Sequence, residues 1–304
     1  MSRRITTFAA ATAAVALIAS LAGCSSSPAT SGESESDVVR IGVVGKSDPQ
    51  WPAFVDAAAA EGIEVELVDF ASYEQPNPAL AEGELDLNQF QHIVYLADYN
   101  VASGQDLTPI GSTGIYPLGL YSQKVDDVAD IKDGDTVLVP DDVSNQARAL
   151  LVLQSAGLIE LTSGGTIFSD LADIDEENSK VEVVALEAAL IPNSLPDAAA
   201  AIINNDFVTQ AGLSFEDAIA QDDPSDANAL PYVNIFAARA DDKDNETYLK
   251  LVEIFQTDEA VQAGLAEASG NTIVPLQTPV ADLEASLAKV EKDTAEARAD
   301  SWPS

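Results

Sequence analysis

The segment VVRIGVVGKSDPQWPAFVDAAAAEGIEVELVDF, residues 38–70, carries a pattern from which the fold class follows. Its first part, 38–45, is a run of β-branched residues that ends in glycine, which is typical of a strand. Residues 50–62 are rich in alanine and also end in glycine, which predicts a helix and its stop. Residues 63–70 alternate between apolar and polar side chains, as a half-buried strand does. Strand, helix and strand at this spacing predict a parallel βαβ unit.

The same alternation runs through the rest of the chain. A short helix is expected at 77–84 and a strand at 85–90, and the pattern restarts after residue 107. Two α/β lobes fit this restart and the length of 304 residues better than one continuous doubly wound sheet. The later elements that we expect are strands at 108–122, 135–140, 181–186 and 231–239, a short helix leading into a strand at 197–205, and helices at 145–157, 245–256, 258–269 and 281–300.

The N-terminus has the features of an export signal. Two arginines precede an apolar run over residues 8–21, which is shorter than a membrane span of about 20 apolar residues. The run ends in LAGC, which resembles the lipobox of bacterial lipoproteins, and Cys24 is the only cysteine of the chain. We therefore predict a signal peptide at 1–23, lipidation of Cys24 as a membrane anchor, and a flexible tether at 24–37. A signal peptide that is cut elsewhere would instead leave a free thiol.

The chain is strongly acidic, with 51 Asp and Glu against 14 Lys and Arg and a formal net charge of −37. Nucleic acid is excluded as a partner because its phosphate backbone needs a basic stripe, and the sequence has none. The acidic excess is typical of a solvated surface. Because of this negative charge, an anionic ligand requires a local arginine that overrides the surrounding negative electrostatic field.

Most catalytic and metal-site chemistry is missing from the sequence. The chain has one histidine and one cysteine, so a zinc site or a Ser-His-Asp triad would have to depend on His92. The sequence contains no G-x-S-x-G elbow, no P-loop and no G-x-G-x-x-G after a strand. We therefore predict a protein that is not an enzyme and that needs neither a metal nor a cofactor.

One arginine stands where α/β proteins bind ligands. Arg148 lies near the start of the predicted helix that follows the buried strand 135–140. Ligands bind beyond the carboxyl ends of strands in open α/β sheets, and a guanidinium can hold a carboxylate with two parallel hydrogen bonds. Asn145 lies three residues earlier on the same helical face, so the two side chains together can hold a small carboxylate. The alternative is an ion pair of Arg148 with Asp141 or Asp142.

Other strand ends add polar and aromatic candidates. Asn204 ends one apolar run and Asn234 lies within another, where an unpaired amide costs about 1–3 kcal/mol. Either asparagine can also be an ordinary turn or bulge residue. The single histidine, His92, lies among aromatic residues that either pack in the core or wall a pocket for an apolar or thioether group. These aromatic residues are Tyr73, Phe90, Tyr95 and Tyr116.

A set of longer motifs extends over most of residues 38–275. They are VELVDFASYEQPNPALAEGELDLNQFQHIVYL, IYPLGLYSQKVDDVADIKDGDTVLVP, SNQARALLVLQSAGLIEL, VVALEAALIPNSL, AIINNDF, QAGL and PYVNIFAARADDKD. The combination of FQH, a YPLGLYS strand, an N-x-x-R-x-L-L helix start and PYVN is specific. In these motifs and their order the chain resembles the methionine-binding lipoproteins of the MetQ/NlpA type, the substrate-binding subunits of ABC importers for methionine.

This resemblance implies a two-lobe periplasmic-binding-protein fold of the type II kind. It is an α/β fold with two crossover strands and a ligand cleft between the lobes. The division that we expect is a signal peptide at 1–23, a lipidated cysteine and tether at 24–37, a first lobe at 38–118 plus 236–280, a second lobe at 119–235, and a C-terminal helix and tail at 281–304.

The resemblance also implies roles for the residues that match the family motifs. Arg148 would clasp the carboxylate of an amino acid, and asparagines would bond its amino and carboxylate groups. Aromatic residues would surround the methionine side chain, with His92 as a pocket wall or a polar orienting group. The implied ligand-binding residues are Tyr73, Phe90, His92, Tyr95, Asn145, Arg148, Asn204 and Asn234.

Three stretches depart from the family pattern. PDDVSN (140–145) lacks the second proline of the family's P-N-D-P-T-N, and this alters the loop that carries the carboxylate grip. FQHIVY (90–95) replaces FQH-x-P-Y, and IPNSL (191–195) replaces L-P-R-S-L, which alters nearby shape or charge. The departures leave the fold unaffected, and they mean that a ligand related to methionine stays an alternative.

The function that we expect is an extracytoplasmic solute-binding lipoprotein that captures L-methionine and delivers it to the permease and ATPase subunits of an ABC importer. The alternatives are the same role for D-methionine, another neutral amino acid or a short methionine peptide, and a surface interaction lipoprotein that has lost transport. The expected location is the extracytoplasmic face of the cytoplasmic membrane, which is the cell surface in a Gram-positive envelope. The terminal helix can be an interaction surface or a solvated addition.

Overall fold

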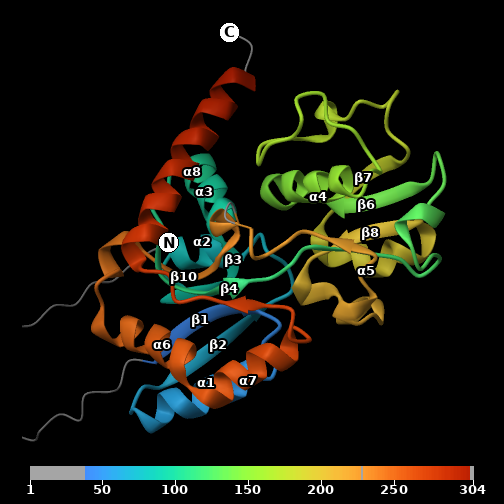
Figure 1. Ribbon diagram of the computed structural model, residues 1–304. Coiled ribbons are helices and arrows are strands. Elements are labelled where there is room, and N and C mark those ends of the chain that lie inside the picture. The colour runs from blue at the N-terminus through green and yellow to red at the C-terminus, as the bar shows by residue number, and fades with distance from the viewer. Residues whose placement is uncertain (1–37, 227–228, 302–304) are drawn as a thin grey trace, which may run out of the picture. The chain divides into compact units, whose positions relative to one another are not determined.

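The computed structural model describes residues 38–226 and 229–301 (Figure 1). These residues belong to one of the chain's two compact units, Ser36–Ser304. The predicted signal peptide, Cys24 and the tether lie outside the described residues. No helix in the described ranges combines the length and the apolar character that crossing a membrane requires.

One half of this unit is built on a mixed sheet of six strands, which come from both ends of the sequence. Its strands, in spatial order, are β11 (Val274–Pro275), β4 (Thr108–Ile115), β10 (Asn234–Ala238), β3 (Leu87–His92), β1 (Val39–Val44) and β2 (Val65–Phe70). β1 pairs in parallel with β2 and β3, so the βαβ unit that the sequence predicts is confirmed. β10 runs antiparallel to β3 and β4, and β11 runs antiparallel to β4.

Helices cover both faces of this sheet (Figure 1). One face carries α1 (Gln50–Ala60), α6 (Glu246–Thr257) and α7 (Glu259–Ala268), and the other carries α2 (Pro76–Ala81), α3 (Ile93–Ser103) and α8 (Val280–Ser301). α1 buries Trp51, Phe54 and Ala58, which share one helical face because of their spacing. Phe54 packs edge-on against Phe255 of α6, with ring centroids 5.7 Å apart.

A second sheet of five strands organises the other half. Its strands, in spatial order, are β7 (Glu182–Leu186), β6 (Thr136–Pro140), β8 (Ala200–Ile203), β5 (Gly119–Tyr121) and β9 (Ala220–Gln221). β6 is parallel to β7 and β8, whereas β5 is antiparallel to β8 and β9. Helix α4 (Val143–Ser155) covers one face with Leu150 and Leu153, and α5 (Ile191–Ser194) covers the other with Ile191.

The chain passes between the two sheets twice, through 116–118 and through 222–233. We call the parts built on the six-stranded and five-stranded sheets the first and second lobes. The two sheets, their covering helices and the two crossings confirm the α/β, two-lobe fold. Short 3₁₀ helices fill connections at Val128–Asp130, Leu171–Asp173, Ala188–Leu190, Leu195–Asp197, Asn205–Phe207, Thr209–Ala211, Phe215–Asp217, Leu230–Tyr232 and Ala240–Asp242.

Strands β9 and β11 and the short helix α5 are not predicted from the sequence, and two longer elements also differ from the prediction. The sequence predicts no helix at Ile93–Ser103 (α3), because the apolar residues of this helix continue the apolar run of β3 without a break. The boundary is set by His92, whose ring caps the helix, and by Gly104, which ends it at φ 69°. The expected short helix that leads into β8 is wrong, because Ala200 and Ala201 lie in the strand itself, buried between two layers. Tertiary burial overrides the helix propensity of alanine here.

The C-terminal helix α8 is confirmed as a helix and is part of the core of the first lobe. Its apolar face buries Leu283, Leu287 and Val290 against α3 and β4. On the polar face of α8, Glu284 accepts a hydrogen bond from Lys243 Nζ at 2.8 Å. A purely solvated addition is therefore excluded.

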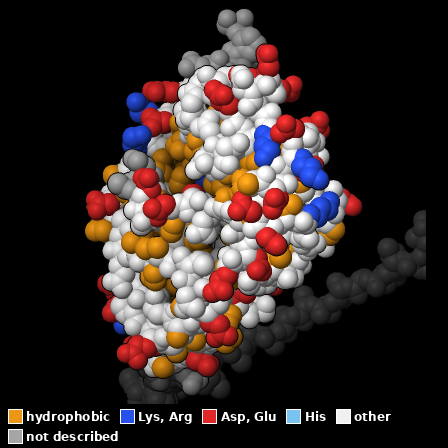
Figure 2. Space-filling view, turned by 45° about the vertical axis from the view of Figure 1, so that its right-hand side comes forward, with side chains coloured by type: hydrophobic (Ala, Val, Ile, Leu, Met, Phe, Trp, Pro, Cys, Tyr) orange, Lys and Arg blue, Asp and Glu red, His pale blue; other side chains and the backbone are white. Residues whose placement is uncertain are grey.

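The acidic surface is spread out (Figure 2). On the face seen there, Asp and Glu side chains occur over most of the molecule, whereas Lys and Arg occupy a few places. Apolar side chains gather in the hollowed part of the same face. This distribution agrees with the interpretation of the acid excess as a solvated surface.

Candidate functional site

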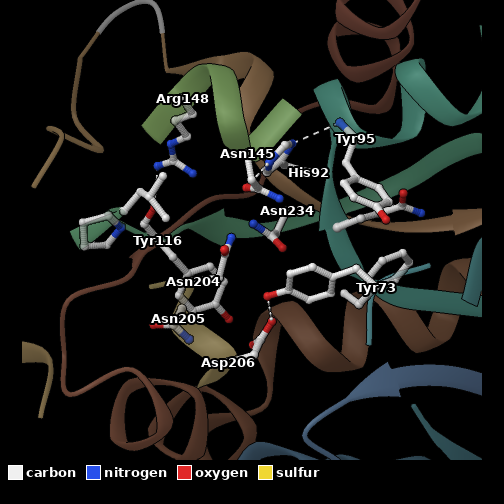
Figure 3. Close-up of a pocket in the computed structure, with 14 residues that line it drawn as sticks. Tyr73, His92, Tyr95, Tyr116, Asn145, Arg148, Asn204, Asn205, Asp206 and Asn234 are labelled. Atoms are coloured by element: carbon white, nitrogen blue, oxygen red, sulfur yellow. Dashed lines mark hydrogen bonds between the residues drawn. The ribbon is translucent and has the colours of Figure 1, made fainter. Parts of the chain in front are cut away.

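A pocket lies where strands of both sheets end (Figure 3). β3 ends at His92, β8 ends just before Asn204, and the antiparallel strand β10 begins at Asn234. The carboxyl ends of parallel strands are the usual binding edge of open α/β sheets. The walls enclose a cavity of about 40 Å³. Since one water molecule needs about 10–15 Å³ on this scale, the cavity holds about three.

All eight residues predicted to bind the ligand line this one pocket, although they come from separate segments of both lobes. They are Tyr73, Phe90, His92, Tyr95, Asn145, Arg148, Asn204 and Asn234. The remaining walls are formed by Gln91, Tyr116, Pro117, Leu118, Asn205 and Asp206.

The N-terminus of α4 fixes the Asn145 side chain. Asp142 is the N-cap of this helix, and its carboxylate accepts from the Asn145 backbone N–H at 2.9 Å and from Asn145 Nδ2 at 3.0 Å. Burial raises the pKa of Asp142 to about 6, although these hydrogen bonds act in the opposite direction. Because its amide nitrogen is held by Asp142, Asn145 turns its amide oxygen toward His92.

Arg148 is the cation of the pocket, and three groups hold its guanidinium. Its Nε donates to Asp222 Oδ2 at 2.6 Å, and its Nη2 donates to the Tyr116 carbonyl oxygen at 2.8 Å. The ring of Tyr232 lies 4.5 Å from the guanidinium carbon, in a cation–π contact. The side chain is 6% exposed. The alternative ion pair with Asp141 or Asp142 is wrong, because Asp142 caps α4 instead and Asp222 takes the guanidinium.

His92 connects the two lobes and stays neutral. Its Nδ1 accepts a hydrogen bond from the Tyr95 backbone N–H at 3.1 Å, so the ring proton is assigned to Nε2, which lies 3.2 Å from Asn145 Oδ1. Burial, followed by the positive charge of Arg148, lowers the pKa of His92 to about 3. Both nitrogens are thus occupied, and the ring positions Asn145 and caps α3.

An aromatic wall closes the side of the pocket away from Arg148. The ring centroids of Tyr73 and Phe90 are 5.9 Å apart, those of Phe90 and Tyr95 5.7 Å, and those of Tyr73 and Tyr95 6.1 Å. Such tilted and edge-to-face pairs are favourable for aromatic rings and leave an apolar surface. Phe207 of the second lobe packs on Tyr73 at 5.2 Å and extends the wall.

The two remaining asparagines lie between the arginine and the aromatic wall (Figure 3). Asn234 is the first residue of β10, and its backbone carbonyl oxygen accepts from Thr113 Oγ1 at 3.3 Å. Asn204 follows β8 and is 9% exposed. Its amide oxygen Oδ1 is buried and meets no hydrogen-bond donor among the described residues. A buried acceptor without a donor is costly unless a ligand supplies one.

Asp206 is a pocket residue that sequence reasoning missed. Its Oδ2 accepts a hydrogen bond from the Tyr73 hydroxyl at 2.7 Å, and this bond joins the second lobe to the first. Burial raises the pKa of Asp206 to about 7, against the effect of the Tyr73 hydrogen bond. Its place two residues after Asn204 was the available signal. Asp222 and Tyr232 were missed as well; Tyr232 belongs to the PYVN motif, whereas no local pattern marks Asp222.

The arrangement suits binding more than chemistry. None of the pocket's lining residues is Ser, Thr, Cys or Lys, and its histidine has both nitrogens occupied. Within residues 38–226 and 229–301, no group of three or more His, Cys, Asp or Glu side chains is placed to hold a metal ion. The pocket instead offers a cation at one side, amides in the middle and aromatic rings at the other side.

A family model described as NlpA lipoprotein matches residues 39–276. The chain belongs to the NlpA lipoprotein family. The match confirms the family resemblance seen in the sequence motifs and covers the strands and helices that build the pocket. It ends before α8, which begins at Val280.

Individual relatives agree with this family. The D-methionine-binding lipoprotein MetQ of Salmonella typhi is 37% identical over 280 residues, which cover 90% of this chain and 99% of that protein. The substrate-binding protein of a methionine transporter from Streptococcus pneumoniae has a TM-score of 0.73 and 33% identity, over 79% of this chain and 95% of the other. A nutrient-binding protein from Burkholderia cenocepacia, solved bound to methionine, has a TM-score of 0.71 and 34% identity, over 78% and 99%.

Proposed function

We propose that this member of the NlpA lipoprotein family is a solute-binding lipoprotein that captures L-methionine for an ABC importer. The observation that carries the proposal is the buried guanidinium of Arg148, fixed beside an aromatic-walled pocket. Two of its five N–H donors bond to Asp222 and Tyr116, which leaves donors for a ligand carboxylate. The methionine-binding relatives support methionine as the ligand.

Each part of methionine has a matching part of the pocket. Arg148 takes the carboxylate, and Asn145, Asn204 and Asn234 bond the carboxylate and amino groups. The thioether chain packs against Tyr73, Phe90, Tyr95 and the edge of His92, because sulfur contacts with aromatic rings are favourable. In this scheme the bound amino acid is carried unchanged.

Capture requires the lobes to separate and close again. The present cavity holds about three water molecules, which is less than a methionine fills. Two hydrogen bonds join the lobes across the pocket, Tyr73 to Asp206 at 2.7 Å and His92 to Asn145 at 3.2 Å. Their separation opens the pocket, and their return around a ligand excludes water and strengthens the contact between Arg148 and the carboxylate.

The remaining steps place the protein in the cell envelope. Lipidation of Cys24 anchors it at the extracytoplasmic face of the membrane, and the tether 24–37 gives the binding unit reach. The closed, loaded form then docks on the permease of the importer, whose ATPase drives transport. The protein itself performs no enzymatic step in this scheme.

A second candidate ligand is D-methionine. The motivating observation is the name of the curated Salmonella typhi relative, a D-methionine-binding lipoprotein. The two enantiomers exchange the positions of the hydrogen and the side chain on the α-carbon. The asparagines that hold the amino group relative to Arg148 and the aromatic wall therefore decide between them.

Calorimetric titration of L-methionine and D-methionine into residues 25–304 tests the proposal. The protein is first unfolded and refolded so that any carried ligand is removed. Tight one-to-one binding of L-methionine is expected. Binding of D-methionine alone would select the second candidate, and no heat with either would overturn the ligand assignment.

The carboxylate site is tested separately with Arg148→Ala. This variant is expected to lose most of the affinity, because it removes the only cation of the pocket. Arg40→Ala is the matched control, since it also removes one positive charge but lies on β1, with its side chain 43% exposed and outside the pocket. Equal affinities of the two variants would contradict the role of Arg148.

A further inference from the structure

Asp206 is a half-buried carboxylate that faces the pocket without a cation. It accepts from the Tyr73 hydroxyl at 2.7 Å, and the side chain of Asn205 is its other hydrogen-bond partner. No Lys, Arg or His forms an ion pair with it within the described ranges 38–226 and 229–301. A carboxylate in such a place is costly unless a cation reaches it.

Arg148, the cation of the same pocket, does not compensate Asp206. Its nearest anion is Asp222, 2.6 Å from Nε. In the view of Figure 3, Arg148 and Asp206 lie on opposite sides of Asn204 and Asn234. The pocket therefore carries a positive end and a separate negative end, with amides between them.

A buried acceptor that lacks a donor is found two residues before Asp206. Asn204 Oδ1 is buried and has no hydrogen-bond partner in the described part of the chain. Both residues belong to one short segment that follows β8, and both line the pocket. Asp206 also has acceptor capacity left, because an ionised carboxylate offers about four lone-pair sites and two donors bond to it here.

We propose that Asp206 and Asn204 Oδ1 together bind the protonated primary amine of the ligand, and that Asp206 makes this amine a requirement for tight binding. An ammonium group carries three donors and one positive charge, so it supplies what both acceptors lack. A ligand with a carboxylate on Arg148 and an ammonium group on Asp206 matches both charged ends. The inference rests on the proposed function and adds a specificity-determining residue to it.

The competing role for Asp206 is purely structural. In that case the carboxylate serves only to hold Tyr73 across the pocket, and its loss weakens every ligand equally. The two roles differ in one measurable respect. An amine-binding residue discriminates between a ligand with an ammonium group and the same ligand without it, whereas a residue that only joins the lobes does not.

The test is a ligand-by-variant comparison with the refolded full-length chain in detergent. Affinities of L-methionine and of its des-amino analogue, in which hydrogen replaces the ammonium group, are measured for the wild type, Asp206→Asn and Tyr73→Phe. Asparagine keeps the shape and can still accept from Tyr73, so Asp206→Asn removes the charge and preserves the bond. Asp197→Asn is the matched control, because it removes an exposed carboxylate of the second lobe outside the pocket.

Asp206→Asn is expected to lower the affinity for methionine at least 10-fold and to change the affinity for the des-amino analogue by less than about 3-fold. Tyr73→Phe is expected to lower the affinity for both ligands by a similar factor, and Asp197→Asn is expected to change neither affinity. An equal loss of both ligands in Asp206→Asn overturns the inference. If the wild type binds neither ligand, the methionine assignment fails instead, and leucine with its des-amino analogue decides the role of Asp206 by the same comparison.

Discussion

Arg148 Nε and Asp222 Oδ2 form an ion pair at 2.6 Å, although 74 residues separate them in the sequence. The other oxygen of Asp222 accepts from the Leu118 backbone N–H at 2.8 Å, on the first crossing between the lobes. Asp222 therefore joins the guanidinium to both chain crossings. These contacts fix the position of the guanidinium.

Replacing Asp222 by Ala is expected to lower the free energy of unfolding by about 1–3 kcal/mol, because it leaves the buried guanidinium without an anion. The partial exposure of Asp222, 27% of its side chain, keeps the loss below that of a fully buried pair. Urea unfolding measures the change. The thermal shift caused by methionine should be larger in the variant than in the wild type, since the ligand carboxylate then supplies the missing anion. An unchanged unfolding free energy would contradict this role.

Replacing His92 by Leu is expected to lower the free energy of unfolding by about 1–2 kcal/mol, because it removes the cap of α3 and the hydrogen bond to Asn145. Urea unfolding measures this change. Asn is a good helix N-cap, so His92→Asn should recover part of the loss. The folded ring has a pKa of about 3, whereas an unfolded histidine has one of about 6.5. As the pH falls from 6.5 toward 3, the unfolded chain takes up a proton that the folded chain does not, so His92 lowers stability progressively. Imidazole resonances of the folded protein that titrate near pH 6.5 would contradict this.

The affinity for methionine is expected to rise as the pH increases from about 6 to 8 and then to level off. Asp206 has a pKa of about 7 in the ligand-free protein, and only its deprotonated form attracts an ammonium group. Tyr73 and Asp48 are the titratable groups that act on Asp206, whose charge in turn acts on Tyr116. Burial raises the pKa values of both tyrosines, so they stay neutral in this range. Calorimetry in buffers of different ionisation enthalpy counts the released protons.

Two variants separate the groups that contribute to this pH profile. Asp206→Asn should flatten it. Asp48→Asn should leave its shape in place and shift it to slightly lower pH, because Asp48, with a pKa of about 6, raises the pKa of Asp206 by its charge. A rise in affinity that survives Asp206→Asn would assign the titration to another group.

Replacing Leu283 of α8 by Ala is expected to lower the free energy of unfolding by about 2–4 kcal/mol, since this side chain is fully buried in the first lobe. Lys289→Ala is the control on the same helix, with its side chain 75% exposed, and should change stability by about 0.5 kcal/mol or less. Chemical unfolding of both variants measures the difference. Equal and small losses would mean that α8 is detached from the core in solution.

Much of the fold could be predicted because its signals are local. The strand at 38–45, the helix at 50–62 and the strand at 63–70 correspond to β1, α1 and β2, with shifts of one or two residues at their ends. Periodicity and glycine stops depend only on neighbouring residues. The prediction failed at Ala200 and Ala201, where burial in the second sheet decides between strand and helix.

The candidate site was predictable to the extent that its residues belong to family motifs. Arg148, Asn145, Asn204 and Asn234 were selected at strand ends, and the structure brings them to one pocket. The roles of these residues in ligand binding stay predictions. Asp206 lies two residues after Asn204 and was still missed, because one carboxylate among 51 acidic residues carries no signal of its own.

The α/β class, the family and the segments that carry the pocket residues follow from the sequence alone, since periodicity, composition and motif order can be read along the chain. Which charged side chains contact each other depends on the tertiary packing. Asp222 rather than Asp142 pairs with Arg148, and Tyr73 reaches Asp206 from the other lobe. Such contacts depend on how the two lobes pack against each other, and their energies are set by the burial that this packing creates.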